Sequence, residues 1–587
     1  MPLENRDICS FFKLRMTELY HKDTLDSYRV RNHNALTLLI ELKSVAAGWL
    51  DSRVKRFETV KYCLEETIEA LKEDICLDYS FLHKDLFIRD LEEYKGIISC
   101  DNKDDEKQKA KEKTPTIVFL ISKCIVHNNK YYLPNLLNKI EEMMFVDHTI
   151  DENDFIPFLQ NFDQLLTSFA TELIHIGYSK VILYKYFSNL WIDTDIDKNK
   201  QMFSELRNKF TNHERKLYYV VFKLQISSEL PQKEILSKYP EFVDTVPQEF
   251  RDAAISNKSY LNSNAAVRFY ILEVNSLDNI SAIKEARKLL SQVLDTRQLG
   301  NVQMKIDIPH SAFTFEKREN NKLWSSFDNS LLIDSTNGNT DVDTQKVVDA
   351  IKKIEENVNI STDVRDRIKF ALRHLRIGDA QPEMEQRFIN YWVGLEFIFS
   401  SPSSSESTFM RMKSYLLKIL TCCYAKRNMY RFNSWLIASK TISAEDKFWE
   451  VADIENRMIN NPNILANYRF KKLKSSMLVH HDKRKKYVMR HKDNIERHLS
   501  RLYRLRNELI HEAGTKEDID CSTSNLRYYL VFLLNQAIMY FSNIDNAEKS
   551  ININDFFYDF ECTERKLTFD WSLQSLLNVD FEENLLT

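Results

Sequence analysis

The residues best suited to chemistry in this sequence lie close together near position 510. The segment RLYRLRNELIHEAG, residues 501–514, brings Arg506, Asn507 and His511 within six positions. An arginine carries a permanent charge on a planar fork of donors that matches a phosphate, and a histidine gains and loses a proton near neutral pH. These side chains could therefore bind a phosphate and move protons at its ester oxygens.

Cleavage of RNA without a metal requires these functions. One group removes the proton of the 2′-hydroxyl, another protonates the leaving 5′-oxygen, and a fixed positive charge stabilises the phosphate. Histidine and arginine can supply all three. Arg506 and His511 are side chains of the types that these roles require. Asn507 could hydrogen-bond to the substrate or orient the motif.

A helix is expected to carry these side chains. Apolar residues recur at helical spacing through residues 491–512, and Gly514 is well placed to cap the helix end. The expected buried stripe comprises Ile495, Leu499, Leu502, Leu505 and Leu509, whereas Arg497, Arg501 and Arg504 are expected to face away from it. His511 would then lie in or near the last turn, where exposed carbonyl groups favour the protonated imidazole.

The spacing of Arg506 and His511 does not place them on one helix face. Five residues correspond to a rotation of about 140° on an ideal helix. Either the last turn is distorted, or the two side chains meet in a cleft formed with another helix or with a second subunit. The cleft arrangement suits an active site that is assembled across a dimer.

Two stretches of the chain resemble a known family. R-N-E-L-I-H, residues 506–511, resembles the arginine, polar residue, variable spacer and histidine signature of HEPN domains, and its surroundings resemble the Apea-like branch. ALRHLRIGDAQPEMEQRFINYWVGLEFIFSS, residues 371–401, resembles the helix of that branch that reads roughly Arg-Phe, Trp and then Leu-Glu. The two stretches occur in the expected order, and the resemblance covers about residues 345–546.

The resemblance implies a helical bundle, usually dimeric, that cleaves RNA without a metal and leaves a 2′,3′-cyclic phosphate. Apea-like members resemble bacterial defence proteins that stop growth on phage infection. The resemblance therefore also implies an abortive-infection effector with a phage-derived trigger, acting as a homodimer or higher homo-oligomer. Transfer RNA is the favoured substrate by this analogy.

The same resemblance assigns site residues by position. Arg506, Asn507 and His511 form the motif, and Glu396 is the acidic residue of the partner helix. Glu396 could orient Arg506 or His511. Its other interpretation, a structural acid on a helix surface or in a core, stays open.

A basic run precedes the motif. From Lys471 to Arg506 the chain has thirteen Lys or Arg residues and three acids, although the formal net charge of the whole chain is −4. Such local basicity is typical of a surface that binds nucleic acid. The candidates for RNA binding are Lys483, Arg484, Lys485, Lys486, Arg497, Arg501 and Arg504. Tyr487 and Tyr503 could stack on bases, and packing at or in a core is the alternative.

Composition argues against other classes of enzyme. Only eight glycines occur in 587 residues, none closer than sixteen residues to the next, so the closely spaced glycines of nucleotide-binding loops are missing. Nine cysteines without a C-x-x-C pair, and histidines without an H-E-x-x-H pattern, suggest no metal site. We expect no metal and no cofactor. Neither a leader nor an apolar span indicates a membrane, so a cytoplasmic location is expected.

The length indicates several domains, and scarce glycine and proline indicate a mainly α-helical chain. We expect a helical N-terminal sensor or regulatory region over 1–262, a small α/β segment and linker over 263–344, an Apea-like HEPN bundle over 345–546, and an acidic, aromatic tail over 547–587.

Three segments carry finer expectations. The charged run 101–116 is expected to be a solvated loop between helices. SSFDNSLLIDSTNGNTDVDTQ, residues 325–345, is expected to be a linker or a partly ordered loop. The tail either packs its aromatic residues on the helical domain or shields a basic cleft.

Two rival functions stay open. The same basic surface could belong to a non-catalytic HEPN module that binds RNA or a protein partner. A helical structural adaptor is the third hypothesis, and an uncharged, buried environment of Arg506 and His511 would favour it.

Overall fold

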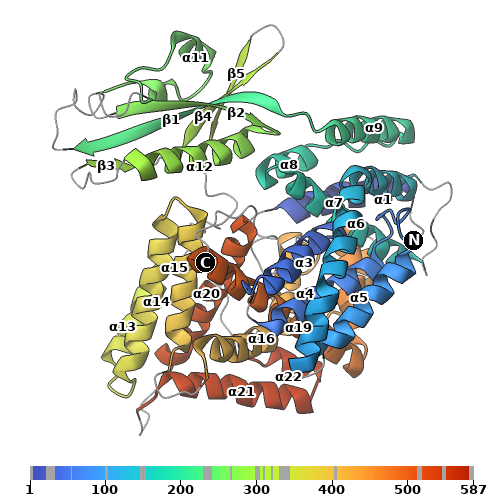
Figure 1. Cartoon of the computed structure of the whole chain (residues 1–587). Coiled ribbons are helices and arrows are strands. Elements are labelled where there is room, and N and C mark those ends of the chain that lie inside the picture. The colour runs from blue at the N-terminus through green and yellow to red at the C-terminus, as the bar shows by residue number, and fades with distance from the viewer. Residues whose placement is uncertain are drawn as a thin grey trace.

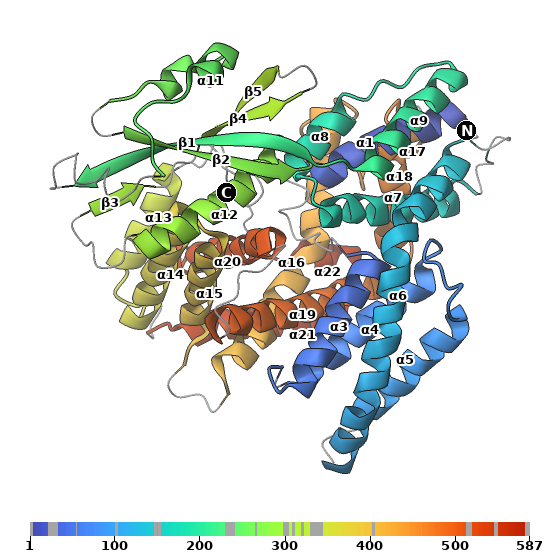
Figure 2. The same cartoon turned by 45° about the horizontal axis from the view of Figure 1, so that its top comes forward.

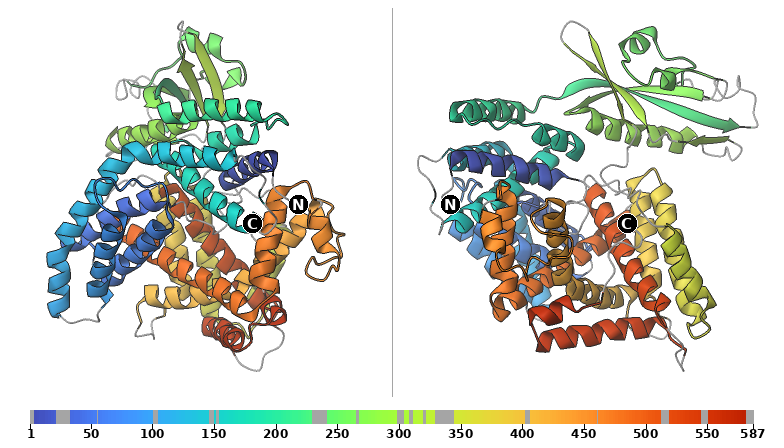
Figure 3. Two further views of the ribbon diagram at one scale, coloured as in Figure 1. Left: turned by 90° about the vertical axis from the view of Figure 1, so that its right-hand side faces the viewer. Right: turned by 180° about the vertical axis from the view of Figure 1, so that it is seen from behind.

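Three regions follow one another along the chain in this computed structural model: a helical N-terminal region, a sheet-bearing segment and a helical C-terminal region (Figure 1). The sheet lies above the two helical regions in Figure 1, and Figure 3 shows the same arrangement from the side and from behind. The structure describes residues 4–21, 33–54, 56–99, 104–145, 150, 154–228, 241–264, 267–297, 304–307, 311–318, 322–328, 344–401, 406–459, 461–511, 519–544 and 550–580.

The N-terminal region is a helical layer around one core. Its helices are α1 (Asn5–Tyr20), α3 (Ala35–Leu50), α4 (Phe57–Glu73), α5 (Lys84–Ser99), α6 (Asp104–Met144), α7 (Phe155–Ile176), α8 (Lys180–Ser188) and α9 (Ile196–Asn212). Phe11, Leu39 and Phe162 are among the fully buried side chains of this core. α6 begins at Asp104, so the predicted loop over 101–116 is wrong from that residue onward, because Lys and Glu are good helix formers.

The sheet-bearing segment contains antiparallel strands. They are β1 (Lys216–Ser228), β2 (Val267–Ser276), β3 (Met304–Asp307), β4 (Ala312–Lys317) and β5 (Leu323–Asp328). The strand order is β2-β1-β4-β5, and β3 pairs with the last residues of β1. Helix α12 (Asn279–Arg297) covers one face, and α11 (Gln248–Ala253) with the 3-10 turn Lys258–Leu261 covers the other. The side chains of β1 alternate between the two cores, with Phe222 toward α12 and Val221 toward α11.

The predicted small sheet is confirmed, but its predicted boundary is wrong. β1 lies inside residues 1–262, which we expected to be helical, and it pairs with β2 from Lys216 to Gln225. Its sequence, KLYYVVFKLQISS, is rich in β-branched and aromatic residues and carried the missed signal. Ser325–Asp328, expected to lie in a linker, belongs to β5. The rest of that expected linker up to residue 343 lies outside the described residues.

The C-terminal region is a helical bundle. Its helices are α13 (Thr344–Glu356), α14 (Thr362–Ala380), α15 (Met384–Phe399), α16 (Thr408–Ala438), α17 (Ile454–Ile459), α18 (Ile464–Leu473), a π-helical turn (Lys474–Leu478), α19 (His481–His511), α20 (Ile519–Ser542), α21 (Ile553–Phe569) and α22 (Leu573–Leu577). α20 has buried apolar residues on several sides, including the consecutive run Leu530–Leu534. It is therefore a central helix, covered by its neighbours.

Helix α19 carries the motif predicted from the sequence. Ile495, Leu499, Leu502 and Leu509 are buried and Leu505 is partly buried, so the predicted apolar stripe is confirmed. The helix is longer than expected and begins at His481. The expected cap, Gly514, lies outside the described residues.

The C-terminal tail packs on the bundle. Phe556, Phe557 and Trp571 belong to the same core as α16 and α20. Nζ of Lys492 on α19 lies 2.6 Å from Oε1 of Glu564 on α21. The described part of the tail therefore follows the packing alternative, and α21 runs along the lower edge of the bundle in Figure 1.

One helix of the C-terminal region belongs to the N-terminal core. Ile464, Leu465 and Tyr468 of α18 are buried among side chains of the N-terminal helices. Tyr468 donates its hydroxyl to Oδ2 of Asp163 at 3.0 Å, and Nε of Arg15 donates to Oδ1 of the same carboxylate at 2.6 Å. The two helical regions are thus interlocked through α18.

Helices α14 and α15 approach closely where Gly378 faces Tyr391. A β-carbon on Gly378 would lie 2.8 Å from Cδ1 of Tyr391, well inside van der Waals contact. Tyr391 is fully buried and donates its hydroxyl to Oδ1 of Asp379 at 2.7 Å. The ring cannot move away without loss of this hydrogen bond.

We predict that Gly378→Ala lowers the free energy of unfolding by about 1–3 kcal/mol, the usual cost of overpacking. Gly96→Ala is the matched control, because that helical glycine has no atom within 4 Å of the added carbon. It should instead stabilise α5 by about 0.5–1 kcal/mol. Urea unfolding of both variants measures the difference, and equal effects would contradict the packing described here.

Candidate active site

Helices α15 and α19 cross at the site predicted from the sequence. The ring centroids of Trp392 on α15 and Tyr503 on α19 are 6.0 Å apart. About one turn further along each helix, Nη2 of Arg506 lies 3.7 Å from Oε1 of Glu396. The fold therefore brings the two stretches quoted above together at one ion pair.

Arg506 and Glu396 lie at the protein surface, with 25% and 27% of their side chains exposed. Nη1 of Arg506 also donates to Oδ1 of Asn507 at 3.2 Å. Nε of Arg506 is buried and has no hydrogen-bond partner among the described residues. The guanidinium is thus held by two neighbours and lies partly exposed at the surface.

His511 is the last residue of α19. Its side chain, like the residues 512–518 that follow, lies outside what the structure describes. The catalytic assignment of His511 remains a prediction.

The two tyrosines considered for base stacking are engaged in packing. Tyr503 stacks on Phe409 of α16, with ring centroids 3.9 Å apart. Tyr487 stacks on Tyr424, also of α16, at 5.2 Å. Both are partly buried and pack against the main core of the bundle. Their geometry is that of the packing alternative.

The arginine row of α19, Arg497, Arg501 and Arg504, faces the N-terminal helices. Arg501 donates to both carboxylate oxygens of Glu41 on α3, at 2.7 and 2.8 Å, and to Glu66 on α4 at 2.8 Å. Arg504 donates to Glu41 as well, and Arg497 donates twice to Glu69 on α4, at 2.6 and 2.7 Å. Figures 1 and 2 both show α3 and α4 beside α19.

The arginine row lies on the opposite side of α19 from the apolar stripe, as expected, but α3 and α4 cover it. The side chains of Arg497, Arg501 and Arg504 are only 11–15% exposed. Carboxylates hold their guanidinium groups, so in this arrangement they do not offer free charge to RNA. RNA binding by these three arginines would require α3 and α4 to move away.

The charge state of this contact follows from its geometry. Burial alone would raise the pKa of the Glu41 carboxyl, but Arg501 and Arg504 lie so close that the pKa falls well below its usual range. Burial alone would likewise lower the pKa of Arg501, and the carboxylates of Glu41 and Glu66 raise it instead. All of these groups are charged at neutral pH.

Other bases of the run before Arg506 also have partners within the protein. Arg484 donates to the backbone carbonyls of Trp571 and Met477 at 2.8 and 3.0 Å, and so holds the tail. Lys474 pairs with Glu455 at 2.5 Å. Lys483, Lys485 and Lys486 are exposed, and none forms an ion pair with another described residue. These three lysines keep their charge available at the surface.

Sequence reasoning did not find the acids on the other side of this contact. Glu66 is an acid, yet it is buried, because its helical spacing from Cys63 and Ala70 places it on the apolar face of α4. An acid on the apolar face of an amphipathic helix is the signal that could have found it, because a buried carboxylate needs a cation. Glu496 on α19 is a further case, since it pairs with Lys413 at 3.0 Å and accepts from Tyr62 at 2.8 Å.

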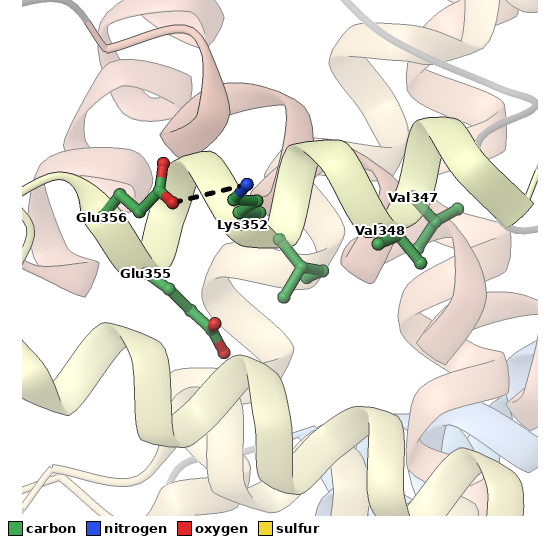
Figure 4. Close-up of a pocket in the computed structure, with 6 residues that line it drawn as sticks. Val347, Val348, Lys352, Glu355 and Glu356 are labelled. Atoms are coloured by element: carbon green, nitrogen blue, oxygen red, sulfur yellow. Dashed lines mark ion pairs between the residues drawn. The ribbon is translucent and has the colours of Figure 1, made fainter.

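A separate pocket opens along α13. Its lining residues are Val347, Val348, Ile351, Lys352, Glu355 and Glu356, and Lys352 pairs with Glu356 at 3.7 Å (Figure 4). None of them belongs to the predicted site. In the described parts of the chain, no group of three or more His, Cys, Asp or Glu side chains could hold a metal ion. No helix among those parts has the length and apolar character that a membrane span needs.

Comparison of the chain with protein-family models, with curated proteins and with solved structures found no match in any of the three.

We predict that Glu41→Gln weakens the contact between α3 and α19 by about 3 kcal/mol at pH 7, because it removes the carboxylate that two buried guanidinium groups share and leaves Arg501 with Glu66 and Arg504 with Glu508. The pKa of Glu41 is depressed in the folded state, so its contribution is complete above its unfolded pKa of about 4.3 and disappears as the pH falls through the folded pKa. Urea unfolding at pH 7 and at pH 3.5 measures both effects.

Glu69→Gln is the control for this prediction. Glu69 pairs with Arg497, but its side chain is 58% exposed, so its loss should cost less than about 1 kcal/mol. The difference between wild type and Glu41→Gln should shrink at the lower pH. If Glu41→Gln unfolds like Glu69→Gln at pH 7, the contact does not contribute as described.

Proposed function

We propose that this chain is a metal-independent endoribonuclease of the HEPN type, with its active site around Arg506 on α19. The observation that carries the proposal is the Arg506–Glu396 pair, which joins the two stretches that resemble this family at one partly exposed point. The reaction class comes from the family resemblance. The Arg506–Glu396 pair is the reason to propose the active site at this point of the structure.

The proposed chemistry is a transesterification. The 2′-oxygen of a nucleotide attacks the adjacent phosphorus, the bond to the 5′-oxygen breaks, and the products carry a 2′,3′-cyclic phosphate and a 5′-hydroxyl. Arg506 would stabilise the charge on the phosphate, and His511 would transfer a proton. Glu396 would fix the direction of the Arg506 guanidinium, and Asn507 would hold it from the other side.

RNA is the proposed substrate, and transfer RNA is favoured by family analogy alone. Lys483, Lys485 and Lys486 are the members of the proposed RNA-binding set that remain exposed and without an ion pair among the described residues. They lie in the first turns of α19, the helix that carries Arg506. They would attract the polyanion toward this helix.

We further propose that two copies of the chain share the site. Phe397 follows Glu396 on α15 and Ile510 lies one turn beyond Arg506 on α19, and both are exposed apolar side chains. Apolar surface beside a charged pair suits a protein interface. A second copy would also supply a partner for His511, which the spacing turns away from Arg506.

The biological role that we propose is that of a cytoplasmic abortive-infection effector. The N-terminal helices would sense a phage-derived trigger or restrain the nuclease. The contact of α3 and α4 with α19 supports this regulatory role, because a movement of the N-terminal helices would be transmitted to α19.

The second candidate is a non-catalytic module that binds RNA or a protein partner. Its support is the arginine row of α19, because carboxylates of α3 and α4 neutralise much of the basicity that suggested an RNA substrate. The adaptor hypothesis has less support, since the Arg506 pair is charged and partly exposed rather than buried.

We predict that the chain of 587 residues cleaves purified transfer RNA in the presence of EDTA. Arg506→Ala should reduce the cleavage rate by about 10²- to 10³-fold and His511→Ala by about 10²- to 10⁴-fold, since each removes charge stabilisation or proton transfer. Arg457→Ala is the control, because this exposed arginine pairs with Asp453 and donates to the backbone carbonyl of Thr441, away from the candidate site, and should leave the rate unchanged. Gel analysis of the RNA, with detection of the cyclic phosphate end, measures the outcome.

Cleavage at the wild-type rate by both Arg506→Ala and His511→Ala would contradict the assignment of these residues to catalysis. RNA binding without cleavage, together with normal growth of cells that express the wild type, would favour the non-catalytic module. In cells, expression of the wild type should arrest growth, and expression of His511→Ala should not.

We predict a smaller effect for Glu396→Gln. The amide keeps the shape and can still accept from Arg506, but it removes the charge, so cleavage should fall by about tenfold, the equivalent of about 1.4 kcal/mol. The Michaelis constant should change little, because Glu396 acts through Arg506 rather than on the RNA. A loss as large as that of Arg506→Ala would make Glu396 itself a proton-transfer group.

A further inference from the structure

An arginine of the N-terminal region lies against the motif helix. Arg56 immediately precedes α4, and its Cζ lies 4.8 Å from the centroid of the Tyr503 ring on α19 and 5.0 Å from that of Phe409 on α16. Its Nη1 lies 3.5 Å from Sδ of Met410. The guanidinium thus covers the aromatic pair that supports the crossing of α15 and α19.

The surroundings of Arg56 differ from those of the arginine row on α19. Arg497, Arg501 and Arg504 each contact at least one carboxylate. Among the described residues no carboxylate lies within ion-pair distance of Arg56, and its contacts are two ring faces and a thioether. Ring faces and sulfur orient a guanidinium but do not neutralise it. Arg56 therefore presents a net positive charge at this point.

Arg56 contacts α19 about one helical turn before Arg506. Tyr503 precedes Arg506 by three residues, which is about 4.5 Å along the axis and places both on adjoining positions of one face. A nucleic acid strand carries one phosphate per nucleotide, so a strand that extends from Arg506 along α19 past Tyr503 would bring a further phosphate to Arg56.

We propose that Arg56 binds a backbone phosphate of the RNA strand whose scissile phosphate lies at Arg506. The inference rests on the proposed function, since it takes RNA as the polymer at this site. It assigns a substrate contact to the N-terminal region. The site then consists of the α15–α19 crossing plus one cation from the segment that joins α3 and α4.

If the role of Arg56 is purely structural, a different salt dependence of RNA binding is expected. A guanidinium that only packs on Tyr503 and Phe409 would affect folding but not the dependence of RNA binding on salt. Each phosphate contact releases counterions from a single strand, with a slope of about −0.7 in log affinity against log salt concentration. The salt slope therefore separates the two roles.

The test measures binding of a single-stranded 2′-O-methyl RNA oligonucleotide to the full chain. This probe has the phosphates but lacks the 2′-hydroxyl, so it cannot be cleaved by the proposed reaction. Arg56→Met keeps an unbranched side chain over the rings and removes the charge. It should weaken binding by about tenfold at low salt and make the salt slope shallower by about 0.7.

Two further variants complete the comparison. Arg56→Lys should restore most of the slope, since the slope counts charges. Arg53→Met, on the same segment, removes a half-exposed arginine that pairs with Asp51 at 3.0 Å, and it should bind as the wild type does. Thermal unfolding of each variant checks that the α4 contact is intact.

An unchanged salt slope for Arg56→Met, or equal losses for Arg56→Met and Arg53→Met, would overturn the inference. So would a wild type that does not bind the probe. The outcome for the proposed function is separate: a wild type that binds the probe through Arg56 but does not cleave unmodified RNA would retain the phosphate contact and reject the nuclease.

Discussion

The contact between the carboxylates of α3 and α4 and the arginine row of α19 is the constraint on which the site depends. Glu41 and Glu66 are held with Arg501 where little water reaches them, and separation of the two layers would expose or strand these charges. The opposite side of α19 buries an apolar stripe in the C-terminal core. One helix is therefore held by both regions, and the position of Arg506 near its end depends on both.

Because of this and similar contacts, many bases of the run over residues 471–506 are paired with acids and are not available at the surface. Counting along the sequence finds thirteen bases against three acids between residues 471 and 506. In space, acids from distant parts of the chain meet many of those bases, as Glu41 meets Arg501 and Glu564 meets Lys492. A charge pattern along a helix describes a surface only when the neighbours of that helix are known. Lys483, Lys485 and Lys486 stay exposed, because no helix or strand of the described part of the chain covers them.

The sequence allowed prediction of features that depend on local pattern. The helical class, the apolar stripe of α19 and the small sheet follow from periodicity and residue type. The sequence left open whether Glu396 orients Arg506 or His511 or is a structural acid, and in the structure its Oε1 lies 3.7 Å from Nη2 of Arg506. Features that depend on distant partners were missed. The charged run after residue 104 forms a helix because its residues favour helix and other helices pack on it, and β1 needed its long pairing with β2 to be recognised. The side chain of His511 is not among those described.

Helix α18 has a consequence for how the protein is made. Tyr468 and its neighbours complete the N-terminal core, yet a ribosome adds them only after the sheet and half of the bundle. Domains usually fold as they are synthesised, beginning with the first. Here the first region cannot close until residue 473 has emerged, shortly before the motif helix is translated. The order of synthesis thus places a nearly complete N-terminal region beside α19 at the moment when Arg506 appears.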